Sequence, residues 1–236
     1  MIEKRKAPLF DLYLENSNLN DKNSLKFLKG FKNEENEIES IKYSKCAMNL
    51  KMPKDKLMKI MKNRHSERAY IDYELSIKEL ASLFSCFSSL ENNRLLPSGG
   101  AKYPIEVYAL CFNVKEINRK IVYYNYNENS LYLVGDCDEW NNYKKLTGAN
   151  GIIEGNPSIL FLFVAFPDRT TSKYGERGGR FVFIESGHYL QNLSLRISYE
   201  GLKGVELGGV YDDEFKKILK LEDTNAIITL GMICGK

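Results

Sequence analysis

The stretch "TTSKYGERGGRFVFIESGHYLQN", residues 170–192, contains the side chains most able to do chemistry. Lys173 and Tyr174 are adjacent, and Arg177 and Arg180 follow closely. An amine or a phenol is a poor base at neutral pH unless nearby positive charge favours its deprotonated form, and the two arginines are candidates for supplying that charge. The same letters also describe a solvated basic turn that leads into a helix. Composition alone leaves both interpretations open.

A second candidate site is the segment "RHSER", residues 64–68. Two arginines and a serine at a helix boundary could bind a phosphate group through charged, bidentate hydrogen bonds. An ordinary solvated basic turn is the alternative interpretation of this segment.

Two glycine-rich segments, "PSGG" (97–100) and "ELGG" (206–209), could let main-chain amides approach a ligand closely. Each also matches an ordinary turn or strand-to-helix connection. The sequence has neither GxGxxG after a strand nor GxxxxGK[ST], which argues against the dinucleotide and P-loop routes to phosphate binding. A GxSxG motif is also absent, and His188 is expected to be a hydrogen-bonded core residue on an apolar helix.

The bulk composition excludes several classes of protein. The 34 cations and 31 anions give a net charge of +3 and are spread along the chain, which argues against a nucleic-acid partner. Five cysteines without CxxC spacing and two distant histidines argue against a metal site or a disulfide framework. The start "MIEKRKAPLF" lacks the apolar core of a signal peptide, and no apolar run reaches membrane-spanning length. We therefore expect a cytoplasmic protein with no membrane partner.

Helices are predicted from spacing and from end signals. "KDKLMKIMKN" precedes the segment 64–68, and Ser76 with Glu79 has the spacing of a capping box at the start of the next helix. A long helix is expected from about residue 181 to residue 200, ended by Gly201, and "YDDEFKKIL" predicts a short helix with acids first and lysines later.

Strands are predicted at 105–114, 121–126 and 131–134, where β-branched and aromatic residues are frequent. "SILFLFVAF" (158–166) is continuously apolar, as a central strand covered on both faces would be, and "NAIITLGMI" predicts a closing strand. This order indicates an α+β domain over residues 51–236. Residues 1–50 form a polar, Asn-rich N-terminal extension whose apolar residues, including "LKFLKGF", are expected to dock on the main body.

Taken in this order, the motifs resemble the nitroreductase-like flavoproteins. More narrowly, the chain resembles the SagB-type azoline dehydrogenases of thiazole/oxazole-modified peptide pathways. "PSGGAKYPIEVY" and "KYGERGGR" followed by "GHYLQNL" are typical of that subgroup, whereas "RHSER" is shared with the wider superfamily.

The resemblance implies an FMN cofactor and a nitroreductase-like fold, with a mixed central sheet flanked by helices. It also implies an intertwined homodimer with flavin sites at the subunit interface. By position, the basic segment would hold the phosphate and ribityl end, the "PSGG" loop would lie against the isoalloxazine, and the "LGG" residues would face flavin N5. Lys236 stands where the superfamily has a basic residue for the phosphate. The implied cofactor-binding residues are Arg64, His65, Ser66, Arg68, Pro97, Ser98, Gly99, Gly100, Leu207, Gly208, Gly209 and Lys236.

In the subgroup, the adjacent Lys-Tyr pair is the catalytic feature, which the resemblance transfers to Lys173 and Tyr174. Azoline oxidation removes a hydride from one ring carbon and a proton from its neighbour, and the proton needs a base within hydrogen-bond reach. One member of the pair would take the proton while the other positions or polarises the ring, and which residue does which stays open.

The activity implied is FMN-dependent conversion of thiazoline or oxazoline rings in a ribosomally synthesised precursor peptide to thiazoles or oxazoles, alongside a cyclodehydratase complex. Two alternatives remain. The first is an NAD(P)H-dependent nitroreductase or quinone reductase, and the second is a low-turnover flavin-binding subunit of a peptide-modification complex.

Overall fold

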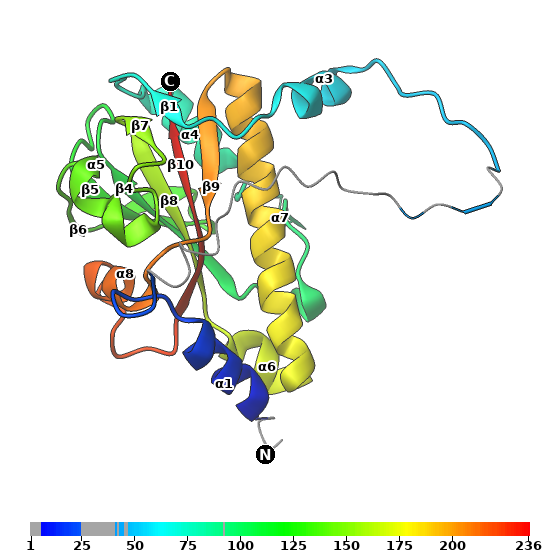
Figure 1. Ribbon diagram of the computed structural model, residues 1–236, viewed down its shortest axis with the longest axis vertical. Helices are drawn as coiled ribbons and strands as arrows, with labels where there is room; N and C mark the ends of the chain where they lie inside the picture. The colour runs from blue at the N-terminus through cyan, green and yellow to red at the C-terminus, as the bar shows by residue number, and fades with distance from the viewer. Residues whose placement is uncertain (1–5, 25–40, 42, 45–46, 92) are drawn as a thin grey trace.

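A six-stranded sheet lies beside one long helix at the centre of the molecule (Figure 1). The computed structural model describes residues 6–24, 41, 43–44, 47–91 and 93–236. The strands are ordered β6-β5-β4-β8-β10-β9. Their bounds are β4 Ile105–Cys111, β5 Lys120–Asn125, β6 Ser130–Asp136, β8 Ile159–Ala165, β9 Lys203–Leu207 and β10 Ile227–Gly235.

Helices cover both faces of this sheet, which explains why β8 is apolar at every position. Ile159, Phe161 and Phe163 belong to the core shared with α4 (Ile77–Ser85) and α7 (Glu176–Glu200). The intervening residues of β8 point the other way, because side chains alternate along a strand. They belong to the core shared with α5 (Trp140–Tyr143) and α8 (Asp212–Ile218). The prediction of a doubly covered central strand is confirmed.

Most predicted elements are confirmed. The helix before the segment 64–68 is α3 (Lys56–Asn63), and the predicted capping box at Ser76 and Glu79 forms in full at the start of α4. Gly201 ends α7 in the left-handed region, with φ 67°. The described part of the chain contains no helix that is both long enough and apolar enough to cross a membrane.

The predicted mixed sheet is confirmed, with its parallel pairing confined to one edge. All five ladders between the six strands are antiparallel. The sheet is mixed only at its β9 edge, where Ser66 forms an isolated parallel bridge with Gly204. Short parallel pairing also joins β1 (Ala69–Tyr70) to β7 (Glu154–Gly155), and β2 (Ser89–Leu90) pairs with β3 (Asn93–Arg94) in a small antiparallel hairpin.

The long helix begins earlier than expected, and the stretch that could be a basic turn is mostly helical. Helix α6 (Asp168–Tyr174) is followed by Gly175, whose φ of 58° and ψ of −141° are not helical. This residue separates α6 from α7, which starts at Glu176. A Cβ on Gly178 would lie 2.8 Å from main-chain atoms of Thr170 and Thr171. Glycine at residue 178 therefore lets α6 fold back tightly on α7.

The N-terminal helix α1 (Pro8–Ser17) docks on the first turns of α7. Phe10 is 8% exposed, and a Cβ on Gly179 would lie 2.5 Å from its ring. The Glu176 carboxylate accepts hydrogen bonds of 2.9 Å from the main-chain N–H groups of Leu9 and Phe10, which satisfies the start of α1. The expectation that apolar residues of the extension dock is confirmed for Phe10. The piece "LKFLKGF" lies outside the described residues.

Candidate functional site

Lys173 and Tyr174 are the last two residues of α6 and lie against the side of α7. The Tyr174 ring packs edge-on against Phe181, with ring centres 5.1 Å apart. Lys173 Nζ lies 5.1 Å from the centre of the Tyr174 ring. The amine and the phenol are therefore held beside one another by a helix end.

The glycine loop (residues 97–100) lies directly against this pair. Gly100 has φ 61°, and a Cβ there would lie 2.2 Å from Tyr174 Oη and 2.9 Å from Lys173 Nζ. Gly99 N–H donates to Glu185 Oε1 over 2.9 Å, and Ser98 Oγ accepts from Tyr103 N–H over 2.7 Å. The structure thus brings the predicted catalytic pair and the predicted loop together.

The basic segment (residues 64–68) follows α3 and runs along the start of β9. Glu67 N–H donates to Gly204 O over 3.0 Å, and Arg68 Nη1 donates to Ser66 O over 3.3 Å. Arg64 and His65 line a hollow of about 70 Å³ together with Lys203 and residues near the end of α7. Neither Arg64 nor Arg68 forms an ion pair with any described residue, so both guanidinium groups are available to an anion.

The main chain of Lys236 lies near the end of the basic segment, but its side chain points toward Tyr73. Its carbonyl oxygen accepts from Ile71 N–H over 2.7 Å. Its Nζ lies 5.0 Å from the centre of the Tyr73 ring. No contact joins it to Arg64, His65, Ser66 or Arg68 among the interactions of the described residues.

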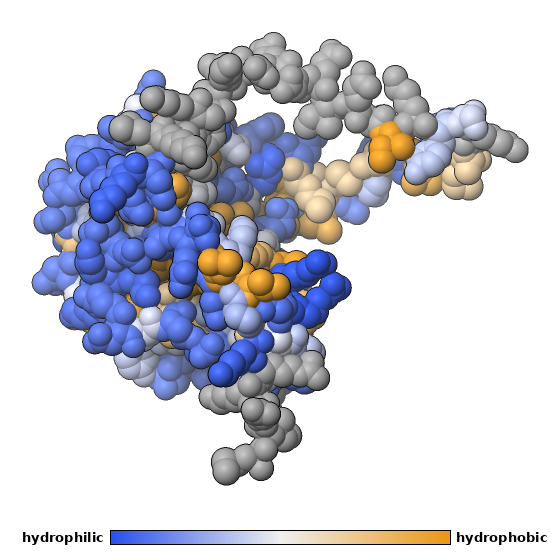
Figure 2. Space-filling model, turned by 60° about the horizontal axis from the view of Figure 1, so that its bottom comes forward, coloured by the Kyte–Doolittle hydropathy of each residue, from blue (hydrophilic) through white to orange (hydrophobic). Residues whose placement is uncertain are grey.

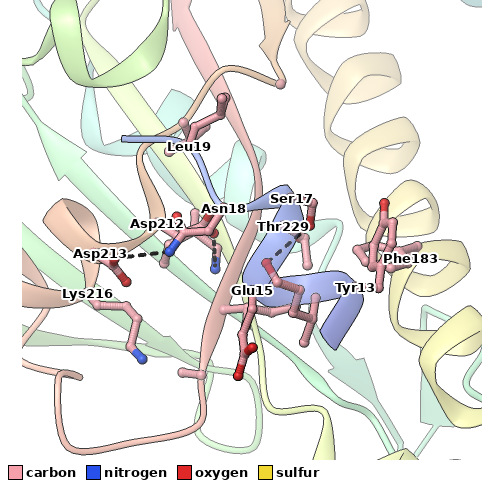
Figure 3. A pocket seen from close by; sticks show the side chains of 16 residues that line it. Tyr13, Glu15, Ser17, Asn18, Leu19, Phe183, Asp212, Asp213, Lys216 and Thr229 are labelled. Atoms are coloured by element: carbon pink, nitrogen blue, oxygen red, sulfur yellow. Dashed lines mark hydrogen bonds between the residues drawn. The ribbon is translucent and has the colours of Figure 1, made fainter. Parts of the chain in front are cut away.

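The strand-end glycines (Gly208 and Gly209) follow Leu207, which is the last residue of β9. Gly208 lines a cavity of about 360 Å³ between α1, α7, α8 and the start of β10. A Cβ on Gly208 would meet no atom within 4 Å, so the main chain faces open space there. Figure 3 shows Asn18 at the end of α1 reaching Asp213, while Phe183 closes the opposite side from α7.

The predicted residues form two groups within one chain. The basic segment and the strand-end glycines share β9, and Gly204 and Gly208 are about 13 Å apart by the rise of a strand. The glycine loop and the Lys-Tyr pair lie near Glu185, whereas the hollow at Arg64 lies near Ile197 and Ser198. These places on α7 are about 20 Å apart by helix rise.

Sequence reasoning missed Glu185, which is 2% exposed and anchors the glycine loop. Burial raises the pKa of this carboxyl, and hydrogen bonds from Gly99 N–H and the Ser98 side chain partly oppose that shift. A signal was present, because Phe181, Glu185 and Tyr189 are spaced four residues apart and so share one face of α7. An acid on the buried face of a helix marks a special position.

Arg94 was also missed, and the expectation for His188 is wrong. The Arg94 guanidinium lies between the rings of Tyr103 and Tyr126, at 4.1 Å and 3.2 Å from their centres. Its Nη2 donates to Tyr189 Oη over 3.3 Å. His188 is only half-buried, and its Nδ1 has no hydrogen-bond partner among the described residues.

The donors fit an anionic cofactor with a planar ring. The basic segment offers two guanidinium groups that have no ion-pair partner among the described residues, the glycine loop offers main chain almost without side chains, and Gly208 faces open space. Among the described residues, no group of three or more His, Cys, Asp or Glu side chains lies close enough together to hold a metal ion.

Comparisons with known proteins agree on one family. The model of the Nitroreductase family matches residues 61–236. The chain is 30% identical over 171 residues to MJ1384 of Methanocaldococcus jannaschii, which is named as a nitroreductase, over 71% of this chain and 86% of that relative. It is 29% identical over 157 residues to the microcin B17-processing protein McbC of Escherichia coli, over 63% of this chain and 58% of McbC. The second match therefore spans less than two thirds of McbC.

Two solved structures establish the fold. A chain of the E. coli microcin synthetase McbBCD complex, determined with truncated pro-MccB17 bound, superposes with a TM-score of 0.72 at 21% identity. That match covers 97% of this chain and 91% of the other chain. A nitroreductase-type protein of Desulfovibrio desulfuricans in complex with FMN superposes with a TM-score of 0.55 at 14% identity, over 78% of this chain and 87% of the other. The nitroreductase-like fold predicted from the motifs is confirmed.

Proposed function

This chain belongs to the nitroreductase family of oxidoreductases, and from that premise we propose that it is an FMN-dependent dehydrogenase that converts thiazoline or oxazoline rings of a ribosomally synthesised peptide to azoles. The observation that carries this proposal is the contact of Lys173 and Tyr174 with Gly100. It puts two candidate bases on the loop that would lie against the flavin ring in this proposal. The similarity to McbC, a microcin B17-processing protein, supports the same substrate class.

The residues described above would hold FMN by their chemistry. Arg64 and Arg68 would pair with the phosphate, with His65 and Ser66 nearby, because guanidinium groups bind phosphate oxygens in bidentate fashion. The Lys236 amine would reach the phosphate only by turning away from the Tyr73 ring. The strand-end glycines would offer main-chain groups to the ring. Bound FMN supplies the acceptor for the hydride.

Lys173 and Tyr174 supply what remains of the reaction. Oxidation of an azoline breaks two C–H bonds on neighbouring ring carbons, so one hydrogen leaves as hydride and the other as a proton. The proton passes to a deprotonated side chain of the pair, and the second member of the pair orients the ring by hydrogen bonding. The Phe181 ring packs against Tyr174 and excludes water from one side of the phenol.

We propose that two copies of the chain complete each site. Within one copy, the glycine loop lies about 20 Å along α7 from the basic segment, so a second copy would bring its loop over the flavin. Exposed apolar residues on α7, namely Phe183, Ile184 and Tyr199, suit such a contact. A complex with a cyclodehydratase is proposed by analogy with the McbBCD assembly.

A second candidate function is NAD(P)H-dependent reduction of nitro compounds or quinones, favoured by the 30% identity to MJ1384. The two functions separate in one experiment. FMN-loaded protein is incubated with an azoline peptide and, separately, with NADPH and a nitroaromatic compound. The proposal expects a peptide product lighter by two hydrogens and slow nitro reduction, whereas fast nitro reduction with an unchanged peptide would support the second function.

A further inference from the structure

Glu185 is an acidic side chain buried between α7 and the glycine loop. It is 2% exposed, on the face of α7 that meets the glycine loop. Burying a carboxylate is costly unless hydrogen bonds compensate. Oε1 accepts from Gly99 N–H over 2.9 Å, and this bond and the nearby Ser98 hydroxyl favour the charged form of the carboxyl, opposing the rise in its pKa that burial causes. The acid is therefore used to hold the loop.

Glu185 forms no ion pair with its charged neighbours among the described residues. Arg94 and His188 are close enough to favour its charged form, yet neither lies within salt-bridge distance of it. Oε2 of Glu185, Nε and Nη1 of Arg94 and Nδ1 of His188 are all buried without a hydrogen-bond partner among the described residues. A carboxylate kept for charge balance would pair with these cations, whereas the hydrogen bond that Glu185 does form goes to the main chain of Gly99.

The link from Glu185 to the reactive pair is short. Gly99 is bound by Glu185, and the next residue, Gly100, is in contact with Tyr174 Oη and Lys173 Nζ. A Cβ on Gly99 would lie 3.2 Å from Phe181 and 3.5 Å from Glu185 Oε1, so the loop is pressed against α7 at the same place where Phe181 packs on Tyr174. Any shift of Gly99 away from α7 therefore moves the surface on which the pair rests.

We propose that Glu185 is the positioning residue of the Lys173–Tyr174 pair: its carboxylate fixes the glycine loop to α7, and the fixed loop sets where the amine and the phenol lie. The catalytic consequence rests on the proposed function, whereas the fixing of the loop does not. The loop is held by a hydrogen bond to the acceptor oxygen Oε1. Glutamine at residue 185 should therefore keep the loop fixed, because it has an acceptor oxygen, and alanine should not.

Amide hydrogen exchange of residues 97–103 tests the fixing of the loop in full-length protein without substrate. Glu185→Ala should speed exchange of this segment about tenfold, since a hydrogen bond to a charged group is lost. Glu185→Gln, which keeps an acceptor oxygen, should stay within about twofold of the natural protein. Ser186→Ala is the matched control, because it removes a buried hydroxyl at the next position of α7 that bonds only to Val182 O among the described residues. If Glu185→Ala does not fold, Glu185→Asp tests the same link, because its shorter side chain withdraws the carboxylate from Gly99 N–H.

Azole formation is measured on the same variants. The proposal expects Glu185→Ala to lose about tenfold in rate and Glu185→Gln to restore it. Unchanged exchange in Glu185→Ala, equal damage by Glu185→Gln, or an equal effect of Ser186→Ala would overturn the proposal. If the natural protein oxidises no azoline while Glu185→Ala still loosens the loop, the proposed function fails and the fixing of the loop stands.

Discussion

Gly100 and Tyr174 are in such close contact that a side chain at residue 100 would occupy the place of the phenol oxygen. The Cβ of an alanine would lie 2.2 Å from Tyr174 Oη and 2.9 Å from Lys173 Nζ. Both atoms are the far ends of side chains that can swing away. The contact therefore ties the absence of a side chain on the loop to the position of the two candidate bases.

Gly100→Ala should disable the reaction while leaving the fold intact. The strain at φ 61° costs about 1–2 kcal/mol, and the displaced Lys173 and Tyr174 should lower azole formation at least about tenfold. Gly151→Ala is the matched control, because Gly151 also has positive φ, 76°, but nothing within 4 Å of its Cβ position. Unfolding by urea and turnover of an azoline peptide give the two measurements. Equal turnover in the two variants would contradict the assigned contact.

Helix α1 should contribute substantially to stability through Phe10. Phe10→Ala removes an aromatic ring that is 8% exposed, which should lower the free energy of unfolding by about 3 kcal/mol. Leu12→Ala, on the same helix but 52% exposed, should change it by less than about 0.5 kcal/mol. Urea denaturation followed by circular dichroism compares the two, and equal losses would mean that α1 is not docked through Phe10.

How far the sequence predicts this protein depends on how local each feature is. The capping box of Ser76 and Glu79 and the helix end at Gly201 each involve residues within one or two helical turns. Their residue types and spacing are therefore enough to predict them from the sequence. The continuous apolar sequence of β8 likewise predicts, without knowledge of its neighbours, that both faces of the strand are buried. The break at Gly175 and the docking of Phe10 on Gly179 were not visible, because each depends on a partner brought near by the folded chain.

The candidate site divides in the same way. The resemblance supplied Lys173, Tyr174 and the residues of the glycine loop, and the structure shows them in contact. It did not supply Glu185, since an acid inside "FVFIESGHYL" gives no indication of which main-chain amide it will bind.

Stability should depend on pH through Asp212 in the cavity beside α1. Burial raises the pKa of Asp212 from 3.8 to about 6, so the folded protein holds this proton more tightly than the unfolded chain does. The stabilisation is fully present below about pH 4 and is lost as the pH rises through about 6, with a loss of up to about 3 kcal/mol.

Asp212→Asn should remove this loss while keeping an acceptor for the Ile228 N–H bond of 3.1 Å. Urea unfolding across this pH range measures it, with Asp223→Asn, an exposed acid, as the control. The expectation would be contradicted if the free energy of unfolding changed with pH in the same way in the natural protein and in Asp212→Asn.

Removing Arg64 should weaken cofactor binding rather than the fold. The side chain has no ion-pair partner among the described residues, so Arg64→Ala should leave stability nearly unchanged. Loss of a charged phosphate contact should lower FMN affinity about ten- to a hundredfold. Lys62→Ala removes an exposed cation from the last turn of α3 and serves as the control. Fluorescence titration of each apoprotein with FMN measures the affinity. Equal FMN affinities of Arg64→Ala and Lys62→Ala would contradict the assignment of Arg64 to the phosphate.

The most direct test of the central claim is the mass of an azoline peptide after incubation with FMN-loaded protein and with the Lys173→Ala/Tyr174→Phe double variant. The proposal predicts that the natural protein gives a peptide lighter by two hydrogens for each ring oxidised. The double variant should bind FMN equally well and leave the peptide unchanged, because no base remains to take the proton. Full azole formation by the double variant would contradict the role given to this pair, and an unchanged peptide with the natural protein would contradict the function itself.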